Sequence, residues 1–477
     1  MDRKEGFRTS TPESVGIGRE SIDKAIEHLR MHKSFLHSLL VMRHGCLVAS
    51  VYSRPWDIHT PHRLFSVTKS IASVLIGMLA KEGRISLDDT ICSYFPEYAG
   101  INPDPRLRRM TIRDALMMRT VRSSTPHKLV PGSKNVLTYS DNWTKSFFEG
   151  RVDHDPGVFF WYDDNSTHVL GSIAEKVTGE SLLEYANRTV FKHLGIESAI
   201  WIKDRVGTCN ANSGLMLSSY DLLKFAAFVM DGCDGFADRE YIKTATAKQT
   251  DNSMAYSGSM DLSYGYGYLY WMHSRRGWMM YGTGGQFAVC IPEKDMIIVI
   301  NGDNQIVNHA QTVLDALWII ADSAGDGSPD GGLPYEKELE LPHAKNPGML
   351  SSYPRSLHAS FSRNDMDLRT LSLEHDGDKG TLTIAFGDEK HSFAFGIGRN
   401  EESPLSFHPE GTVALSSLGM TDDGAYLFLS QFKGLELGSF MIEAKVSGNT
   451  VDAAVRTHGE VSFEIRNGYA SGTVSQL

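Results

Sequence analysis

Apolar residues gather in short runs near the two ends of residues 1–324, and polar turn residues separate these runs. The pattern predicts a helix at 20–32, hairpin arms at 39–43 and 46–52, further hairpin arms at 286–291 and 296–300, and a helix at about 309–323. Because each hairpin lies next to a helix, we expect one antiparallel sheet assembled from both ends of this region and flanked by helices.

Between the two hairpins the apolar residues recur with the period of an α-helix. Helices are predicted at 66–82, 111–118, 166–177, 181–194 and 219–230. Since these segments follow one another without strand-like runs between them, they predict a helical lobe at about 66–255 beside the sheet.

The predicted secondary structure changes from mainly helical to strand-like after a turn-rich stretch at 325–334. Strand-like runs separated by Gly, Asp and Asn follow it, at 381–386, 392–395, 426–429, 439–446, 451–455 and 461–465. This spacing predicts a linker at 325–339 and a separate all-β sandwich or barrel at 340–477. The predicted fold class is therefore α+β, followed by an all-β C-terminal domain.

Composition and charge narrow the range of partners. The chain is 41% hydrophobic and carries a formal net charge of -11, with no basic stripe. Such a chain is a poor candidate for binding nucleic acid or anionic lipid. No apolar run reaches the roughly 18 residues that a membrane span needs. Residues 1–14 lack the apolar core of a secretory signal, which predicts a cytoplasmic protein.

The cysteines give no sign of a disulfide framework or a zinc site. There are five of them, an odd number, and no two form a Cys-x-x-Cys pair. Their apolar surroundings predict core thiols. We expect no metal and no organic cofactor.

The pattern Ser-x-x-Lys is the first chemical signal. Serine needs a base to become a nucleophile, and residues three apart on a helix share a face, so the lysine amine can reach the hydroxyl. The pattern occurs three times, at Ser21–Lys24, Ser66–Lys69 and Ser430–Lys433. Ser21 opens a charged helix and Ser430 lies in a predicted strand, where such residues do not share a face. Only Ser66 opens a helix that becomes strongly apolar after the lysine.

The surroundings of Ser66 resemble a known family. Phe65-Ser66-Val67-Thr68-Lys69-Ser70, an apolar helix, and then Glu82-Gly83-Arg84-Ile85-Ser86-Leu87-Asp88-Asp89 resemble the first motif of the serine β-lactamase-related superfamily. That superfamily includes class C β-lactamases, D-Ala-D-Ala carboxypeptidases, D-aminopeptidases, carboxylesterases and nylon-oligomer hydrolases. The resemblance covers about residues 10–323, and it implies a β-lactamase/transpeptidase-like fold with Ser66 as nucleophile and Lys69 as its proton-transfer partner.

The second motif of that superfamily is Tyr-x-Asn or a variant that keeps the tyrosine. The segment 156–165, Pro-Gly-Val-Phe-Phe-Trp-Tyr-Asp-Asp-Asn, resembles it best. The resemblance makes Tyr162 the catalytic tyrosine, a proton-transfer partner of Ser66 together with Lys69. Asp164 then occupies the usual Asn place and Asn165 follows it, so either can contact Lys69 or the substrate. Tyr139 is a further candidate for the cleft, whereas Tyr185 lies in an amphipathic helix and is interpreted as a packing residue.

The third motif is a strand that carries Lys-Thr-Gly, His-x-Gly or a looser relative. Here the segment Tyr281-Gly282-Thr283-Gly284-Gly285-Gln286 resembles it. The resemblance assigns substrate binding to these residues, and the backbone N–H groups of Thr283 and Ser66 to an oxyanion hole. No cation stands at the first position, which argues against β-lactamase and carboxypeptidase activity. The Gly-x-Gly-Gly-Gln form is closer to nylon-oligomer hydrolases and related amidases or esterases.

These residues predict a serine hydrolase that forms an acyl-enzyme with a small ester or amide, or with a short peptide. Two alternatives stay open. One is D-amino-acid peptidase, carboxypeptidase or β-lactamase activity, and the other is a catalytically silent fold that serves as a binding module. An oligomer is compatible with the sequence.

Overall fold

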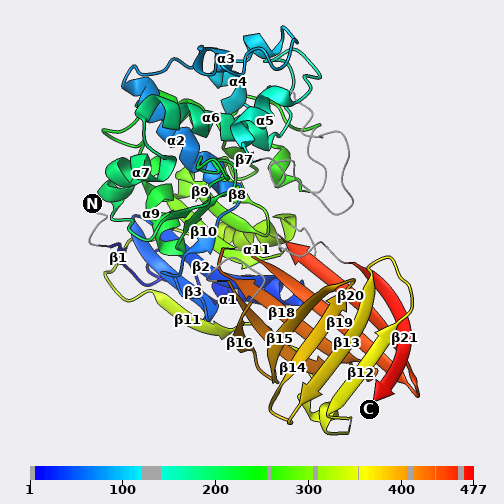
Figure 1. The fold of residues 1–477 in the computed structure, drawn as a ribbon. Coiled ribbons are helices and arrows are strands. Elements are labelled where there is room, and N and C mark those ends of the chain that lie inside the picture. Colours follow the sequence, from blue (N-terminus) through cyan, green and yellow to red (C-terminus); the bar gives the residue numbers. More distant parts are fainter. Residues whose placement is uncertain are drawn as a thin grey trace. The chain divides into compact units, whose positions relative to one another are not determined.

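A computed structural model describes residues 6–120, 141–254, 259–304, 310–352, 354–405, 412–435, 437–459 and 467–476 (Figure 1). The chain forms two compact units. The first ends at Leu339 and the second begins at Glu340. Each unit has its own apolar core.

A mixed, mainly antiparallel sheet forms the centre of the first unit. Its order is β1-β3-β2-β10-β9-β8-β7, and β11 pairs with β3. The strands are β1 (Arg8–Thr9), β2 (Phe35–Arg43), β3 (Cys46–Arg54), β7 (Trp271–His273), β8 (Gly277–Gly282), β9 (Gln286–Ile291), β10 (Met296–Asp303) and β11 (Tyr335–Glu340). Met296 pairs with Arg43 on one side and with Ile291 on the other, so the two distant hairpins join in one sheet. The predicted sheet is confirmed.

The turn between β2 and β3 explains why the first hairpin forms where the sequence predicts it. His44 and Gly45 both have positive φ, 50° and 69°. Two such residues in a two-residue loop match the right-handed twist of the flanking strands. The turn therefore fixes the register in which Arg43 pairs with Cys46.

Helices cover the sheet. Every residue of β2, β9 and β10 is buried, which requires covered faces on both sides of the sheet. Helix α1 (Arg19–Met31) packs against α11 (Ala310–Ser323) and β2, and α9 (Ser219–Met230) packs against β2, β9 and β10.

The predicted helical lobe is present, and one apolar helix runs through it (Figure 1). Its helices are α2 (Val67–Lys81), α3 (Ile91–Tyr94), α4 (Ile112–Leu116), α5 (Trp143–Glu149), α6 (Asp164–Thr178), α7 (Leu182–Ala186), α8 (Lys192–Leu194) and α10 (Arg239–Ala245). A small sheet accompanies them, with strands β4 (His62–Arg63), β5 (Ile200–Trp201) and β6 (Leu215–Leu217). Helix α2 contacts α6, α10 and β8, and all its residues from Val67 to Leu79 are buried. The start of α2 is thereby held between lobe and sheet.

The stretch 325–339, predicted as a linker, contains most of a strand at its C-terminal end. Residues from Tyr335 onward form β11, which pairs with β3. The Tyr335 hydroxyl donates to Asp23 Oδ1 at 2.8 Å, so this stretch belongs to the first unit. The turn-rich part before it masked the short alternating pattern of the strand.

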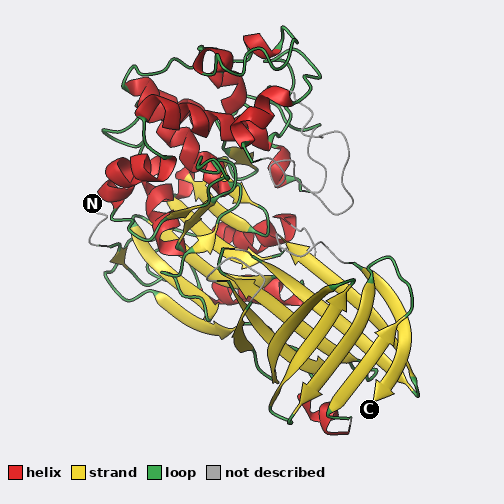
Figure 2. Cartoon of the chain, in the orientation of Figure 1, coloured by secondary structure: helices red, strands yellow, loops and turns green. Residues whose placement is uncertain are grey.

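The second unit is a β-barrel, drawn as yellow arrows in Figure 2. Its strands are β12 (Ser356–Phe361), β13 (Leu368–His375), β14 (Lys379–Phe386), β15 (Glu389–Ile397), β16 (Glu401–Pro404), β17 (Val413–Met420), β18 (Tyr426–Lys433), β19 (Gly438–Ser447), β20 (Thr450–Gly459) and β21 (Gly468–Gln476). A pairing of β15 with β17 closes nine of these described strands into a ring, and β16 pairs with β17 beside it. The strand predicted at 461–465 lies outside the described residues.

Alternation along the strands fills the barrel. In β14 the buried positions are Leu382, Ile384 and Phe386, every second residue. Inward residues of the other strands join them in one apolar core. This period of two is the signal that predicts an all-β domain from the sequence.

Candidate active site

Ser66 is the N-cap of α2, and the residue before it has a strained backbone conformation. Phe65 before it has φ 47°, in the left-handed region that bulky residues rarely adopt. Ser66 is partly exposed, while Phe65 and Val67 on either side are buried. Backbone strain of this kind costs of the order of 1–3 kcal/mol and clusters at functional sites. The chain therefore presents this hydroxyl to solvent from an otherwise buried segment.

Lys69 is buried, and its ammonium is fully engaged. Its side chain is 1% exposed. The Nζ atom lies 2.8 Å from Ser66 Oγ, 2.9 Å from the Asn212 carbonyl oxygen and 2.7 Å from Asp164 Oδ1. An ammonium has three hydrogens, so each can be given to one of these acceptors. The helical spacing of three residues brings the serine and the lysine together, as predicted from the pattern.

Tyr162 lies beside the same ammonium. The centroid of its ring is 5.0 Å from Lys69 Nζ, within the range of a cation–π contact. The ring stacks on Trp271 at 5.3 Å and meets Tyr266 edge-on at 6.3 Å. Three aromatic side chains thus form one wall next to the amine.

The first turn of α6 brings a carboxylate to Lys69. Asp163, completely buried, is the N-cap and accepts hydrogen bonds from Asn165 N at 3.0 Å and Ser166 Oγ at 2.5 Å. This cap fixes the direction in which the next residue, Asp164, leaves the helix. Of the two residues that the sequence left open, Asp164 makes the contact with Lys69. Asn165 Oδ1 is buried and has no hydrogen-bond partner among the described atoms.

The glycine-rich segment reaches the serine through Gly282, the last residue of β8. A Cβ on Gly282 would lie 2.2 Å from the Leu64 carbonyl oxygen and 3.1 Å from the Ser66 amide nitrogen. Only glycine permits so close an approach. Gly284 and Gly285 have φ 81° and 85° and turn the chain into β9, while Thr283 is exposed between them and Gly282.

Two further residues that the sequence assigns to the site are Gln286 and Tyr139. Gln286 is completely buried, and its amide donates to the carbonyl oxygens of Gly302 at 2.7 Å and Thr283 at 3.2 Å. It also accepts from Gly302 N at 3.2 Å. These contacts give Gln286 a bracing role for the turn, in place of the substrate contact expected from the motif. Tyr139 lies outside the described residues.

Sequence reasoning missed Asn212. The carbonyl oxygen of Asn212 accepts a hydrogen bond from Lys69 Nζ, and its backbone N–H donates to Asn210 Oδ1 at 3.0 Å. The Asn-Ala-Asn-Ser-Gly stretch at 210–214 was a visible turn signal, but nothing in it indicates which segment it approaches. The aromatic-rich sequence around Trp271 is compatible with a cleft wall or with a core strand, and Trp271 lies in β7 with 2% exposure.

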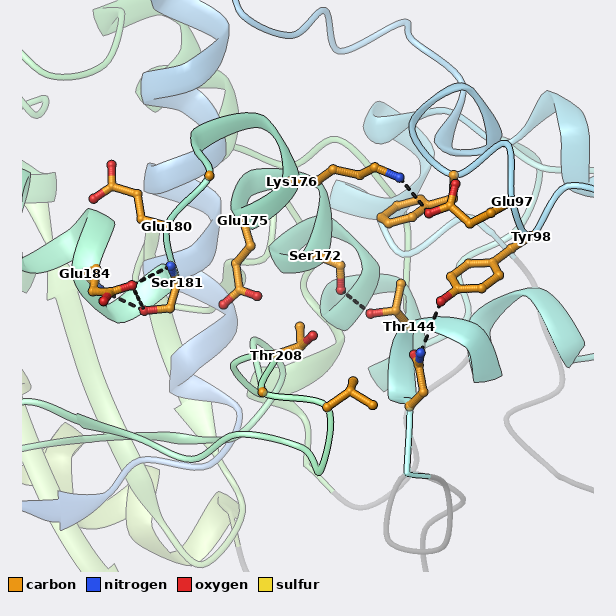
Figure 3. A pocket seen from close by; sticks show the side chains of 15 residues that line it. Glu97, Tyr98, Thr144, Ser172, Glu175, Lys176, Glu180, Ser181, Glu184 and Thr208 are labelled. Carbon is orange, nitrogen blue, oxygen red and sulfur yellow. Dashed lines mark hydrogen bonds and ion pairs between the residues drawn. The ribbon is translucent and has the colours of Figure 1, made fainter.

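A separate polar pocket of about 560 Å³ lies in the helical lobe (Figure 3). Glu175 projects toward its centre in Figure 3, and its Oε1 accepts from the backbone N–H groups of Leu182 at 2.9 Å and Cys209 at 3.1 Å. Burial raises the pKa of Glu175 above its usual range. Lys176 pairs with Glu97 at 2.6 Å on the rim. None of the predicted site residues lines this pocket.

Three further features of the described residues bear on chemistry. They contain no group of three or more His, Cys, Asp or Glu side chains arranged to hold a metal ion. All five cysteines are buried and none forms a disulfide bond. Within the same residues, no helix has both the length and the apolar character to cross a membrane.

Comparison with known families matches residues 37–312, more than half of the chain, to the family described as Beta-lactamase. The chain belongs to the Beta-lactamase family. The match includes both hairpins, the helical lobe and all the candidate site residues. Members of this family are usually serine hydrolases.

Individual relatives are distant. The 6-aminohexanoate-dimer hydrolase of Paenarthrobacter ureafaciens is 26% identical over 221 residues, which are 43% of this chain and 54% of that protein. The chain thus spans about half the length of this curated relative. Two solved structures share the fold of the family domain. A Bacillus anthracis protein described as a candidate 6-aminohexanoate-dimer hydrolase has a TM-score of 0.52 at 19% identity, over 62% of this chain and 80% of that one. A Bacteroides dorei protein described as a candidate β-lactamase has a TM-score of 0.53 at 15% identity, over 64% and 99%.

Proposed function

We propose that this family member is a serine hydrolase that cleaves small esters or amides through an acyl-enzyme on Ser66. The observation that carries the proposal is the 2.8 Å contact between Lys69 Nζ and Ser66 Oγ at the start of a buried helix. A positioned amine is the base that a serine hydroxyl needs. The amidase relative and the family match support the same reaction class.

The proposed reaction assigns one role to each of these groups. Lys69 acts in its amine form, after one proton of the ammonium has passed to solvent. Ser66 Oγ attacks the carbonyl carbon, and its proton passes to the lone pair of this amine, beside Tyr162. The carbonyl oxygen becomes an anion that the N–H groups of Ser66 and Thr283 stabilise. The tetrahedral intermediate collapses and the bond to the leaving group breaks. Tyr162 gives its hydroxyl proton to that group and takes the proton held by Lys69 in exchange. Water then attacks the ester of Ser66 by the same route and releases the acid.

A fluorophosphonate probe tests this proposal, because it labels an activated serine covalently. We expect labelling of the wild type, and none of Ser66→Ala. Ser21→Ala is the matched control, since Ser21 belongs to another Ser-x-x-Lys pattern in α1, where its hydroxyl donates to the Gly18 carbonyl oxygen. Labelling that persists in Ser66→Ala refutes the proposal, and so does an unlabelled wild type.

Turnover identifies the reaction. A panel of p-nitrophenyl esters, D-aminoacyl anilides and nitrocefin separates esterase or amidase activity from peptidase and β-lactamase activity. We expect turnover of the esters to exceed that of nitrocefin. Preferred release of D-amino acids would favour the peptidase alternative, and failure on every substrate would favour a binding module.

A further inference from the structure

The carboxylate of Asp164 changes the charge of the proposed cleft. It lies 2.7 Å from Lys69 Nζ, and its side chain is 32% exposed whereas that of Lys69 is 1% exposed. The ammonium is therefore covered, and the part of the ion pair that solvent or a ligand can reach is the carboxylate. A ligand at Ser66 meets a pair of cancelling charges whose negative member is outermost.

Two arginines on neighbouring segments contact backbone oxygens. Arg63 Nε donates to the Ser213 carbonyl oxygen at 2.8 Å, and its guanidinium lies over the Phe65 ring at 5.3 Å. Arg119 reaches the carbonyl oxygens of Gly157 at 3.4 Å and Gln249 at 3.5 Å.

The glycine-rich segment near Ser66 adds no charge to that of Asp164. The segment 281–286 consists of Tyr, Gly, Thr, Gly, Gly and Gln, and Thr283 is its exposed residue. Beside Lys69 Nζ lies the partly exposed ring of Tyr162, which stacks on the buried Trp271 at 5.3 Å. An acyl group on Ser66 that contacts the Tyr162 ring leaves water for an aromatic surface, which favours apolar groups and disfavours unpaired ions.

We infer that Asp164 is a specificity-determining residue, which makes the cleft select acyl donors without a carboxylate. The inference rests on the proposed function, because it concerns the acyl group that Ser66 takes up. Neutral aliphatic or aryl esters and amides carry no charge that Asp164 repels. An anionic acyl group meets Asp164 as a like charge, with the compensating ammonium buried behind it.

Two esters of equal chain length isolate the charge. They are p-nitrophenyl hexanoate and the mono-p-nitrophenyl ester of adipic acid, which differ by a terminal carboxylate. For the wild type we expect kcat/KM to favour the neutral ester by about tenfold or more. Asp164→Asn removes the negative charge and keeps the size of the side chain, so this preference should fall about tenfold, mainly through KM for the anionic ester. Asp155→Asn is the matched control, since Asp155 is exposed and paired with Arg109.

The outcomes separate the inference from the proposed function. An unchanged preference in Asp164→Asn, with both esters still hydrolysed, overturns the inference and leaves the serine hydrolase intact. No turnover and no Ser66 labelling in the wild type overturns both. If Asp164→Asn is inactive or misfolded, inhibition of the wild type by phenylboronic acid and 4-carboxyphenylboronic acid decides, because boronates bind a serine hydroxyl without turnover. We expect the neutral boronate to bind about tenfold more tightly, and equal or tighter binding of the carboxylate overturns the inference.

Discussion

Gly282 approaches Ser66 so closely that no side chain fits between the two segments. A Cβ on Gly282 would lie 3.1 Å from the Ser66 amide nitrogen and 2.2 Å from the Leu64 carbonyl oxygen. Both neighbours are backbone atoms, which cannot swing aside as the end of a flexible side chain can. The end of β8 and the start of α2 therefore form one rigid corner, in which the proposed oxyanion-binding N–H groups stand.

The added methyl group in Gly282→Ala should push the end of β8 away from the start of α2. We expect a loss of about 100-fold or more in kcat/KM for esters, because a displacement of about 1 Å at reacting groups costs that much. Gly100→Ala is the control, since a Cβ at Gly100 has open space around it. Ester kinetics with a thermal-unfolding check on both variants give the result. Wild-type kinetics in Gly282→Ala would show that the corner does not position the reaction.

The cap of α6 links local structure to the proposed site. Asp163→Ala removes a buried acceptor of two hydrogen bonds and should lower the free energy of unfolding by about 1–3 kcal/mol. Activity should fall as well, because the cap directs Asp164 toward Lys69. Asp163→Asn keeps an acceptor oxygen and should lose less on both counts. Urea unfolding and ester kinetics measure the two effects, and equal losses in both variants would contradict a capping role.

Several elements of the fold and one contact of the site can be predicted from neighbouring residues in the sequence. The His44-Gly45 turn has the residues that a two-residue hairpin needs, and α2 follows from the apolar run after Lys69. The serine–lysine contact is also local, because three residues of helix set it. The closure of the C-terminal strands into a barrel was only one of two predicted forms, since the pairing of β15 with β17 depends on residues far apart in the chain.

The rest of the site depends on contacts between distant segments. Sequence spacing left open whether Asp164 or Asn165 meets Lys69, because one residue of helix rotates a side chain by about 100°. Asn212 reaches Lys69 across 143 residues, and no local signal marks such a contact. Gln286 was assigned to the substrate by its place in a motif, while its buried position assigns its amide to the backbone of Gly302.

Substitutions of Lys69 and Asp164 should have non-additive effects on the free energy of unfolding, whereas the second substitution should not restore activity. Lys69→Met should lower kcat about 1,000-fold or more, because the serine loses its base. It also leaves Asp164 without its cation, so unfolding should become easier by about 1–2 kcal/mol, a modest figure because that carboxylate is partly exposed. Adding Asp164→Asn should restore most of the stability and none of the activity. A double-mutant cycle from urea unfolding tests the coupling, and strictly additive losses would refute it.

The C-terminal barrel should fold by itself. Its apolar core consists of its own residues, and the β15–β17 pairing closes the ring. We expect residues 340–477, expressed alone, to unfold in a single cooperative transition with the circular dichroism of a β protein. The Phe393→Ala variant, which empties a buried position in the middle of that core, should lower the free energy of unfolding by about 3–5 kcal/mol. A non-cooperative melt of the isolated domain would show that its core is incomplete.

Two buried histidines should make the first unit sensitive to acid. Burial lowers the pKa of His62 to about 4 and that of His168 to about 3, from an ordinary value near 6.5. Below about pH 6.5 the unfolded chain binds a proton at each histidine and the folded chain does not. The stability from each neutral histidine is thus present above that pH and is lost as the pH falls toward 4, by about 1.4 kcal/mol per pH unit. In His168→Gln, the free energy of unfolding should fall less steeply between about pH 6 and 4, by about 1.4 kcal/mol per pH unit. Its dependence on pH above about pH 7 should be unchanged. Urea unfolding across this range measures both slopes, and identical slopes in the two proteins would show that His168 does not stay neutral in the fold.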